Sequence, residues 1–304
     1  MLRLLTFACA LGLLSPWLTH WAVPYSAELT WLLDLASHWQ WLYVALLAIG
    51  VILLARKNLQ WLILLPLVAL PWFSAAPQLP DAPGKPLISV RLVTANMQQM
   101  SDPSLLRAWL NAKRADVVLL QEVTPALAAT LATWHDYPHQ VLEPTDSPFG
   151  IALLSNLEIH NPEVVFTNGH IPRIDAQLGD DAKAFRLSVM HPMPPLTPFW
   201  HQELNQYIEL ATSEHDAQPL PAIIAGDLNA SAWAQAIRPL HMSNWWRASN
   251  LKATWPAWGR GWFGIGIDQF IVSGPWRVTE QNIGPNIGSD HLPRSIRLSL
   301  LKAQ

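Results

Sequence analysis

The chain has 304 residues, of which 51% are hydrophobic, and its 19 basic and 22 acidic side chains give a formal net charge of −3. Residues 81–304 hold 16 of the basic and 20 of the acidic residues, and this acidic balance disfavours a protein that binds long nucleic-acid duplexes. The single cysteine, Cys9, lies in an apolar N-terminal segment, which excludes a thiolate metal site or a cysteine nucleophile in the rest of the chain.

Three apolar segments fill the N-terminal quarter. Residues 4–21, 39–55 and 59–76 carry no charged side chain. The last two segments are separated by Arg56, Lys57 and Asn58. Each segment approaches the length of about 20 residues that a helix needs to cross a bilayer. We therefore expect residues 1–76 to form a membrane anchor with three transmembrane helices. A cleaved signal peptide is the alternative for the first segment, but its apolar stretch exceeds the usual length of about 7–15 residues.

The basic residues of the anchor predict its orientation. Arg3, Arg56 and Lys57 are the Lys and Arg residues of the first 80 positions, whereas the connection between the first two segments carries Glu28 and Asp34. By the positive-inside rule, the N-terminus and the Arg-Lys turn are expected in the cytoplasm. An odd number of spans then places everything after the anchor on the opposite side.

Residues 77–86 contain four prolines and a glycine. This composition predicts a stiff linker that holds the next domain away from the bilayer by a few tens of ångström at most. The domain is expected to cover residues 87–304, which is long enough for one sizeable core.

Strand-like and helical segments alternate through this domain. Apolar strand-like runs cover residues 87–95, 116–120, 150–154, 184–190, 222–225, 267–272 and 293–300, and helices are expected from 102, from 124 and over 199–214. Such alternation is typical of a layered α/β fold. Because several of these strands end at a polar residue, a cleft is expected at one edge of the sheets.

Two motifs in the last quarter indicate metal-dependent chemistry. Gly-Asp-Leu-Asn at 226–229 follows an apolar run, and Gly-Ser-Asp-His stands at 288–291. Each motif places oxygen ligands or an imidazole where a rigid strand end holds the group and a loop leaves it open to substrate. Taken alone, the first motif is also typical of an ordinary strand-to-turn junction with local hydrogen bonds.

The complete ordered set of polar residues resembles the endonuclease/exonuclease/phosphatase superfamily, and the chain looks like its membrane-anchored bacterial branch. The set consists of Asn96, Glu122, His191, Asp227, Asn229, Asp268, Asp290 and His291. The resemblance covers essentially all of residues 87–300. It implies a four-layer α/β/β/α sandwich, with two packed mixed sheets flanked by helices, and a hydrolase of the nuclease or phosphatase kind.

The resemblance also implies a divalent metal ion, Mg²⁺ with Mn²⁺ as the alternative. Glu122 is the main expected ligand, and Asp290 and Asn96 are expected to complete the site. Mg²⁺ prefers one or two carboxylates together with waters and substrate oxygens, so a sparse set of ligands suits it. The structural alternative for Glu122 is a carboxylate that caps the helix beginning near Thr124.

The catalytic roles follow the same resemblance. Asp227 is expected to orient and deprotonate the attacking water, and Asn229 to donate to the phosphate. His291 would bind the scissile phosphate or act as an acid, paired with Asp268, which fixes its tautomer and raises its pKa. His191 would be a second donor to the phosphate, whereas a lone histidine at a strand end is otherwise often structural.

Some features depart from the family pattern or lie outside it. Gln98 and Gln269 stand where many family members have other residues, which leaves the number of metals and the substrate open. In the segment 255–263, Trp258 and Trp262 stand among glycines. This suits a loop that binds a substrate base or sugar or enters the bilayer interface. The alternative is that Trp255 and Trp262 are core anchors.

The sequence thus predicts a membrane-tethered, Mg²⁺-dependent phosphoesterase that prefers phosphodiesters to monoesters. We expect it in the bacterial inner membrane, with the catalytic domain on the periplasmic side. The alternatives are an extracytoplasmic nuclease acting on DNA or RNA and a lipid or phosphoinositide-type phosphatase. A silent phosphate-binding scaffold fits the complete residue set least. Nucleic acid is not a required partner, and no obligate protein partner is indicated.

Overall fold

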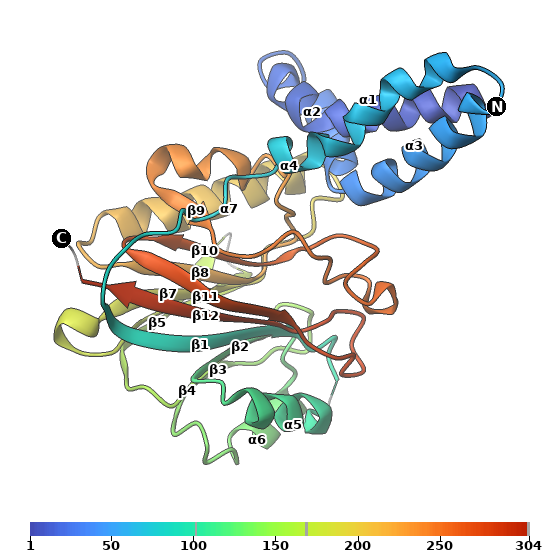
Figure 1. The fold of residues 1–304 in the computed structure, drawn as a ribbon. Helices are drawn as coiled ribbons and strands as arrows, with labels where there is room; N and C mark the ends of the chain where they lie inside the picture. Colours follow the sequence, from blue (N-terminus) through green and yellow to red (C-terminus); the bar gives the residue numbers. More distant parts are fainter. Residues whose placement is uncertain (101, 168–169, 303–304) are drawn as a thin grey trace.

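The computed structural model describes residues 1–100, 102–167 and 170–302, and Figure 1 shows two parts. The N-terminal helices project from one end of the molecule. The remaining chain forms two β-sheets with helices on their outer faces.

The first sheet has six strands in the order β11-β12-β1-β2-β4-β3. Its strands are β1 (Pro86–Asn96), β2 (Val117–Gln121), β3 (His139–Glu143), β4 (Ile151–Ser155), β11 (Trp276–Ile283) and β12 (Arg294–Leu301). β1 and β2 run parallel, and the other neighbouring pairs are antiparallel. The sheet is therefore mixed.

The second sheet also has six strands, in the order β5-β6-β7-β8-β10-β9. Its strands are β5 (Ile159–Thr167), β6 (Ile171–Leu178), β7 (Phe185–Met190), β8 (Ala222–Asp227), β9 (Trp245–Arg247) and β10 (Asp268–Ser273). Only β7 and β8 run parallel among its neighbouring pairs. This sheet is mixed as well.

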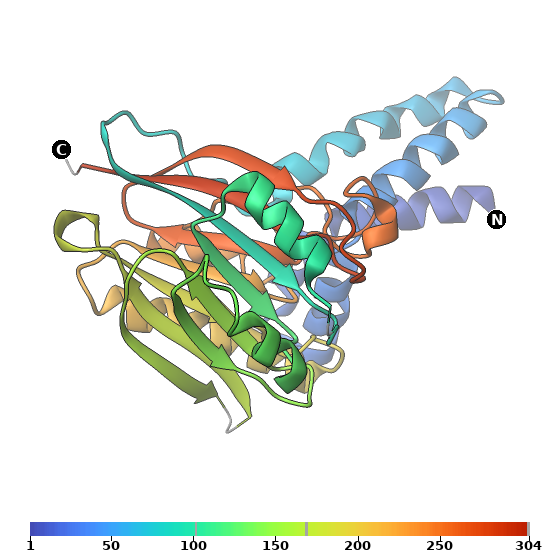
Figure 2. The same ribbon diagram turned by 90° about the horizontal axis from the view of Figure 1, so that it is seen from below.

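The two sheets face each other across a continuous apolar core, in which Leu119 of the first sheet and Phe270 of the second are fully buried. Two helices, α5 (Ser104–Lys113) and α6 (Pro125–Leu131), pack on the outer face of the first sheet, and Figure 2 shows them in green. On the other side, α7 (Pro198–Asp216) packs on the second sheet. The structure therefore confirms two packed mixed sheets flanked by helices.

All seven strand-like runs found in the sequence are strands, and α5, α6 and α7 match the three expected helices. The strands that the sequence did not predict are β3, β5, β6, β9 and β11. Four of these form the sheet edges. Edge strands are partly exposed or very short, so they lack the continuous apolar run of a strand buried on both faces.

The N-terminal region differs from the three expected spans. α1 (Leu2–Ala22) matches the first segment and is long and apolar enough to cross a membrane. The second segment is α3 (Gln40–Ala55), which is too short to cross a membrane alone. It is long and apolar enough only together with α2 (Ala27–Ser37), and the two helices are bent by 69° relative to each other. The described residues therefore contain one such helix, or two if the bent pair counts as one span, and not three.

The third segment consists of a 3₁₀ helix, η1 (Leu59–Ala69), followed by the short helix α4 (Leu70–Ser74). Proline explains why it is not a continuous α-helix. Pro66 lies inside η1 and Pro71 lies at the start of α4. Neither has an amide hydrogen to donate, and each ring clashes with the preceding turn of an α-helix.

The proline-rich segment 77–86 differs from the expected spacer because the chain around it lies on the domain surface. The amide of Ala76 donates to the carbonyl of Ala232 at 2.6 Å, and the amide of Leu79 donates to the carbonyl of Arg247 at 2.8 Å. The Arg247 Nε donates back to the carbonyl of Ala76 at 3.1 Å. The N-terminal helices also contact the domain directly, since Trp233 Nε1 donates to the carbonyl of Pro71 in α4 at 2.9 Å.

Candidate active site

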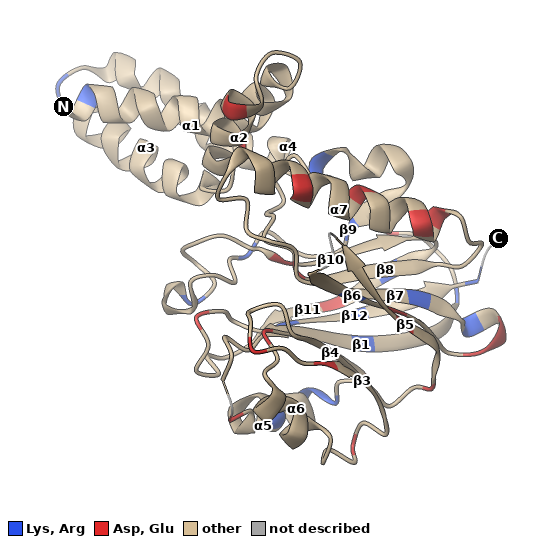
Figure 3. Ribbon diagram, turned by 180° about the vertical axis from the view of Figure 1, so that it is seen from behind, with Lys and Arg blue, Asp and Glu red and all other residues tan. Residues whose placement is uncertain are grey.

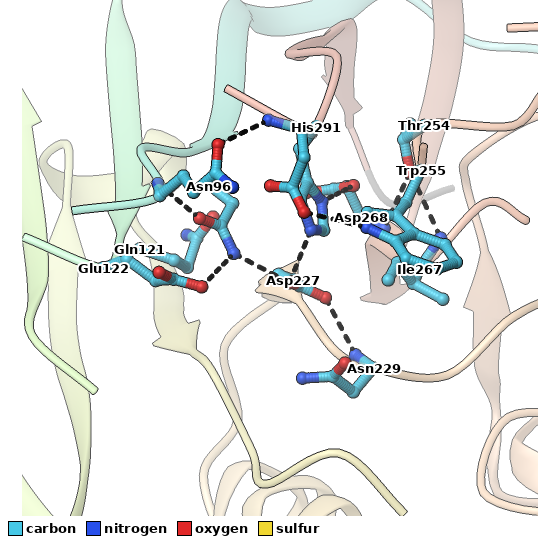
Figure 4. A network of polar contacts seen from close by, with 12 residues as sticks. Asn96, Gln121, Glu122, Asp227, Asn229, Thr254, Trp255, Ile267, Asp268 and His291 are labelled. Carbon is cyan, nitrogen blue, oxygen red and sulfur yellow. Dashed lines mark hydrogen bonds and ion pairs between the residues drawn. The ribbon is translucent and has the colours of Figure 1, made fainter. Parts of the chain in front are cut away.

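Six polar residues predicted for the site come together at one edge of the stacked sheets, and Figure 4 shows most of them. The first sheet contributes three of them: Asn96 at the end of β1, Glu122 after β2 and His291 before β12. The second sheet contributes the other three: His191 after β7, Asp227 at the end of β8 and Asp268 at the start of β10. β10 runs antiparallel to β8, so its first residue pairs directly with the last residue of β8. Both carboxylates therefore lie at the same edge.

Three residues at this edge of the sheets have a positive φ, which is an unusual backbone conformation. Gly226 has a φ of +148°, and a Cβ placed there would lie 1.9 Å from the carbonyl oxygen of Met190. Only glycine allows β8 to approach the end of β7 this closely. Glu122 and Asn229 have φ values of 58° and 49°, in the left-handed region that ordinary residues seldom occupy. These sharp turns direct functional side chains away from the strands.

The carboxylate of Asp227 is the centre of the polar network. Asn96 Nδ2 donates to Asp227 Oδ2 and to Glu122 Oε1, both at 3.0 Å. The backbone amide of Asn229 donates to Asp227 Oδ1 at 3.0 Å. The Asn96 amide thus lies between two carboxylates and offsets their mutual repulsion.

Two imidazoles flank Asp227. His191 Nε2 lies 3.5 Å and His291 Nε2 3.6 Å from Asp227 Oδ2. Burial acts to raise the pKa of Asp227, but the charges of the two histidines outweigh it and hold the pKa well below its usual range. Asp227 is therefore ionised at neutral pH.

The same contacts raise the pKa of both histidines. Burial disfavours the charged form of His191, yet its hydrogen bond to Asp227 and the charges of Asp227 and Glu122 raise its pKa above the usual value. For His291, burial is outweighed by the charges of Asp268 and Asp227, which raise its pKa to about 10. His291 is consequently an imidazolium at neutral pH, a form that favours contact with an anionic phosphoester.

His291 and Asp268 form the expected pair. His291 Nδ1 donates to Asp268 Oδ2 at 3.0 Å, and the Asp268 side chain is fully buried. Asp268 is held in turn by its backbone amide, which donates to the hydroxyl of Thr254 at 3.3 Å. The pair fixes the imidazole so that its Nε2 faces Asp227. Thr254 gave no recognisable signal in the sequence.

A model of the endonuclease/exonuclease/phosphatase family matches residues 93–291, about two thirds of the chain. The chain belongs to the endonuclease/exonuclease/phosphatase family. Members of this family hydrolyse phosphoester bonds and use divalent metal ions. A search among curated proteins found no match.

Solved structures of the family share this fold. TDP2 of D. rerio, humanised by 14 mutations, is 16% identical with a TM-score of 0.57, and the match covers 69% of this chain and 99% of that one. The endonuclease/exonuclease/phosphatase from Beutenbergia cavernae DSM 12333 is 18% identical with a TM-score of 0.57, covering 71% and 72%. D. rerio TDP2 complexed with a single strand DNA product is 16% identical with a TM-score of 0.56, covering 69% and 99%. At these identities the likeness shows the fold alone.

The metal site implied by the family fits the oxygen donors beside Asp227. Glu122 is partly exposed, and its Oε1 accepts from Asn96. Hard carboxylate oxygens with open access suit Mg²⁺ or a similar ion. Asp227, Asp268 and His291 could also hold a metal ion, since each has a ligand atom within 4.8 Å of the other two. However, Asp268 and His291 are already hydrogen-bonded to each other. Glu122 therefore remains the expected main ligand.

The third expected ligand, Asp290, is held by a residue pair that the sequence did not assign to the site. Asp290 Oδ2 accepts from the indole Nε1 of Trp255 at 3.0 Å. Its backbone amide donates to Gln98 Oε1 at 2.9 Å, and the amide of Gln98 donates to Asn96 Oδ1 at 2.8 Å. Gln98, noted in the sequence only as a departure from the family pattern, thus connects the loops of two expected ligands.

The remaining expected residues lie at the margin or outside the site. Asn229 Nδ2 donates to the carbonyl of Pro192 at 2.9 Å, which leaves its second amide hydrogen for a ligand. Trp258 and Trp262 are 71% and 86% exposed, so they are not core anchors. Neither lines the cavity over the catalytic residues, which is lined instead by Trp255.

The metal assignment leads to a direct test. Exchange of Glu122 for Gln replaces a charged hard-oxygen ligand with a neutral amide, so we expect the Mg²⁺ concentration needed for half-maximal activity to rise at least about tenfold. The measurement is a Mg²⁺ titration of activity. Glu143→Gln, a change on the edge strand β3, is the matched control. An unchanged titration for Glu122→Gln would move the main ligand elsewhere.

Proposed function

We propose that this protein is a membrane-tethered, divalent-metal-dependent phosphodiesterase of the membrane-anchored bacterial branch of its family. The observation that carries the proposal is the position of Asp227, a buried carboxylate whose Oδ2 lies within 3.6 Å of Nε2 of both His191 and His291. Glu122 lies next to this group through Asn96. A base, two imidazole donors and a metal ligand are therefore brought together at one edge of the sheets.

In the proposed reaction, Asp227 orients a water molecule and accepts its proton as the water oxygen bonds to phosphorus. The bond from phosphorus to the leaving oxygen breaks, and the leaving alkoxide takes up a proton from water. His291, held by Asp268, and His191, held by the carbonyl of Pro148 at 3.0 Å from its Nδ1, direct Nε2 at the phosphoryl oxygens as negative charge grows there. A divalent ion bound at Glu122 would neutralise charge on the phosphoryl and leaving oxygens.

The charge of the site favours a diester over a monoester. Within the described parts of the chain, no Lys or Arg lines the cavity at the catalytic residues. A phosphomonoester carries more negative charge than a diester and requires more cationic contacts to bind. The two imidazoles and one metal ion suit the singly charged group better.

Activity assays of the full chain in detergent test this function. A chromogenic phosphodiester, a matched monoester, a plasmid, short single strands and phospholipids would be compared with and without Mg²⁺. We expect Mg²⁺-dependent release from diesters, and little from monoesters. Hydrolysis of plasmid or single strands alone would support the nuclease alternative. Absence of hydrolysis from every substrate, with folded protein and added metal, would contradict the proposal.

The N-terminal helices support the membrane tether. α1, α3 and η1 pack side by side around Leu13, Leu47 and Val51, and the projecting bundle is visible in Figures 1 and 2. By its rise per residue, α1 extends about 32 Å, which matches a hydrocarbon thickness of about 30 Å. Leu4 and Ile63, on the outside of the bundle, are 75% and 81% exposed. Such an apolar outer surface is suited to lipid.

The charges of the bundle support the proposed orientation. Arg3, Arg56 and Lys57 lie at the end remote from the sheets, and Figure 3 shows blue there and tan along the helices. Asp34 lies at the opposite end, where its Oδ2 pairs with His201 Nε2 of the domain at 3.0 Å. This distribution suits a cytoplasmic tip and a periplasmic catalytic domain in the bacterial inner membrane.

The orientation predicts the outcome of reporter fusions. A reporter that is active only outside the cytoplasm should be active when fused to the C-terminus and silent when fused after Asn58, because the Arg56-Lys57 turn should stay in the cytoplasm. A reporter that is active only in the cytoplasm provides the control and should give the reverse pattern. The opposite outcome for both reporters would contradict the topology.

A further inference from the structure

The catalytic residues form one end of a cavity whose other walls are apolar except for His38. The cavity has a volume of about 640 Å³, which is in the range of small-molecule sites. Asp227, Asn229 and His291 line the catalytic end. The apolar walls include Leu35, Trp39, Phe149, Met193, Leu196 and Ile265.

Two of these wall residues come from the N-terminal region and not from the catalytic domain. Leu35 belongs to α2, and Trp39 lies at the break between α2 and α3. Both are partly buried, and the indole of Trp39 packs edge-on against that of Trp255 with ring centroids 6.4 Å apart. The anchor therefore supplies part of the wall of the catalytic cavity.

Buried polar contacts hold this wall in place. The Asp34 carboxylate bonds to His201 Nε2 at 3.0 Å and accepts from the backbone amide of Gln235 at 2.8 Å. Trp31 Nε1 donates to the carbonyl of Pro195 at 2.8 Å, next to the wall residue Leu196. Removal of one partner from a buried polar network is costly, so these contacts favour one fixed position of α2 on the domain.

The apolar surface continues beyond the cavity. Leu196 is 71% exposed, and Phe199 at the start of α7 is 58% exposed. α2 packs against α7 and contributes the exposed side chain of Leu32. In the proposed topology, this region lies where the helices leave the bilayer. The cavity thus connects the catalytic residues to an apolar surface at the level of the membrane.

We infer that the substrate is a membrane phospholipid, whose phosphodiester lies at Asp227 and whose acyl chain lies along the wall formed by Leu35, Trp39 and Leu196. This inference rests on the proposed phosphodiesterase activity and names its substrate class. A nucleic-acid strand has further phosphates on both sides of the scissile bond and is normally held by Lys and Arg. Within the described residues, no Lys or Arg lines this cavity, and its walls beyond the catalytic residues are apolar except for His38.

The inference is tested with a series of chromogenic phosphodiesters whose alkyl chain increases in length, assayed with the full chain in detergent. Each methylene buried in the cavity should strengthen binding about fourfold, so KM should fall steeply with chain length until the cavity is filled. For Trp39→Ala, the ratio of kcat/KM between long-chain and short-chain diesters should fall at least about tenfold. Phe166→Ala, which removes an exposed aromatic from the edge strand β5, is the matched control and should leave this ratio unchanged.

A second variant and a second readout separate the two proposals. Leu35→Gln places a polar group in the wall without removing any of the hydrogen bonds that seat α2, and it should lower the ratio in the same direction. Calorimetric binding of long-chain and short-chain alkylphosphonates requires no turnover and should show the same dependence on chain length. Mg²⁺-dependent hydrolysis without any dependence on chain length would overturn the lipid inference alone. Preferential binding of the long chain without hydrolysis of any diester would contradict the proposed function instead.

Discussion

Asp227→Asn should lower the turnover of the full-length protein by about 10²–10⁴, with little change in apparent substrate affinity. The amide keeps the size of the side chain and can still accept from the amide of Asn229, but it cannot take a proton from water. The loss should therefore appear in kcat. The measurement is steady-state kinetics on a chromogenic diester with saturating Mg²⁺.

The variant also has an internal control. The Asp227 charge is one of the causes that raise the pKa of His291 to about 10, so this pKa should fall in the variant. An imidazole titration followed by NMR would measure the change. Full turnover by a variant in which this pKa has fallen would show that Asp227 is not the base.

The second large effect concerns the pair of Asp268 and His291. His291→Ala should lower kcat/KM by about 10²–10⁴, and Asp268→Asn should reproduce much of this loss because it removes the carboxylate that orients the imidazole. The double variant should be little worse than the worse single variant, because the two side chains act as one unit. A double-mutant cycle measured on kcat/KM tests this.

A folding control is needed because the Asp268 carboxylate is fully buried. Thermal melts should therefore accompany the kinetics, and only folded variants enter the cycle. Ser273→Ala at the far end of β10 serves as the matched control and should leave kcat/KM unchanged. Strict additivity of the Asp268 and His291 losses in folded protein would contradict the pairing and, with it, the proposed role of His291.

The parts of the fold that could be predicted from the sequence are those with a strong local pattern. β2 and β8 are buried along their whole length, and each begins with an unbroken apolar run of four residues. The edge strand β5 escaped detection because half-exposed residues interrupt its pattern. In the third apolar segment, high hydropathy predicted a helical span, but Pro66 and Pro71 determined the local geometry.

In the candidate site, too, only the residues with a local sequence signal could be predicted. Asn96, Glu122, Asp227 and His291 could be selected from the sequence because each stands beside a recognisable strand and in a recognisable order. The supporting contacts could not be predicted. Gln98, for example, bonds to Asp290 across 192 positions of the chain. Nothing local in the sequence indicates a pairing over that separation.

By itself, the sequence determined that the chain has an apolar N-terminal region and an α/β domain, and it supplied the residues predicted to react. Residue type sets what a side chain can ligate, donate or protonate, and local periodicity reports burial. Only the tertiary structure decided that Leu35 and Trp39 of the N-terminal region form a wall of the cavity at the candidate site. The sequence suggested a spacer after the N-terminal region, because proline composition describes the stiffness of a segment and not the surface on which it lies. The position of α2 depends on buried partners of Asp34 that lie more than 150 residues away, and such contacts exist only once both parts have folded together.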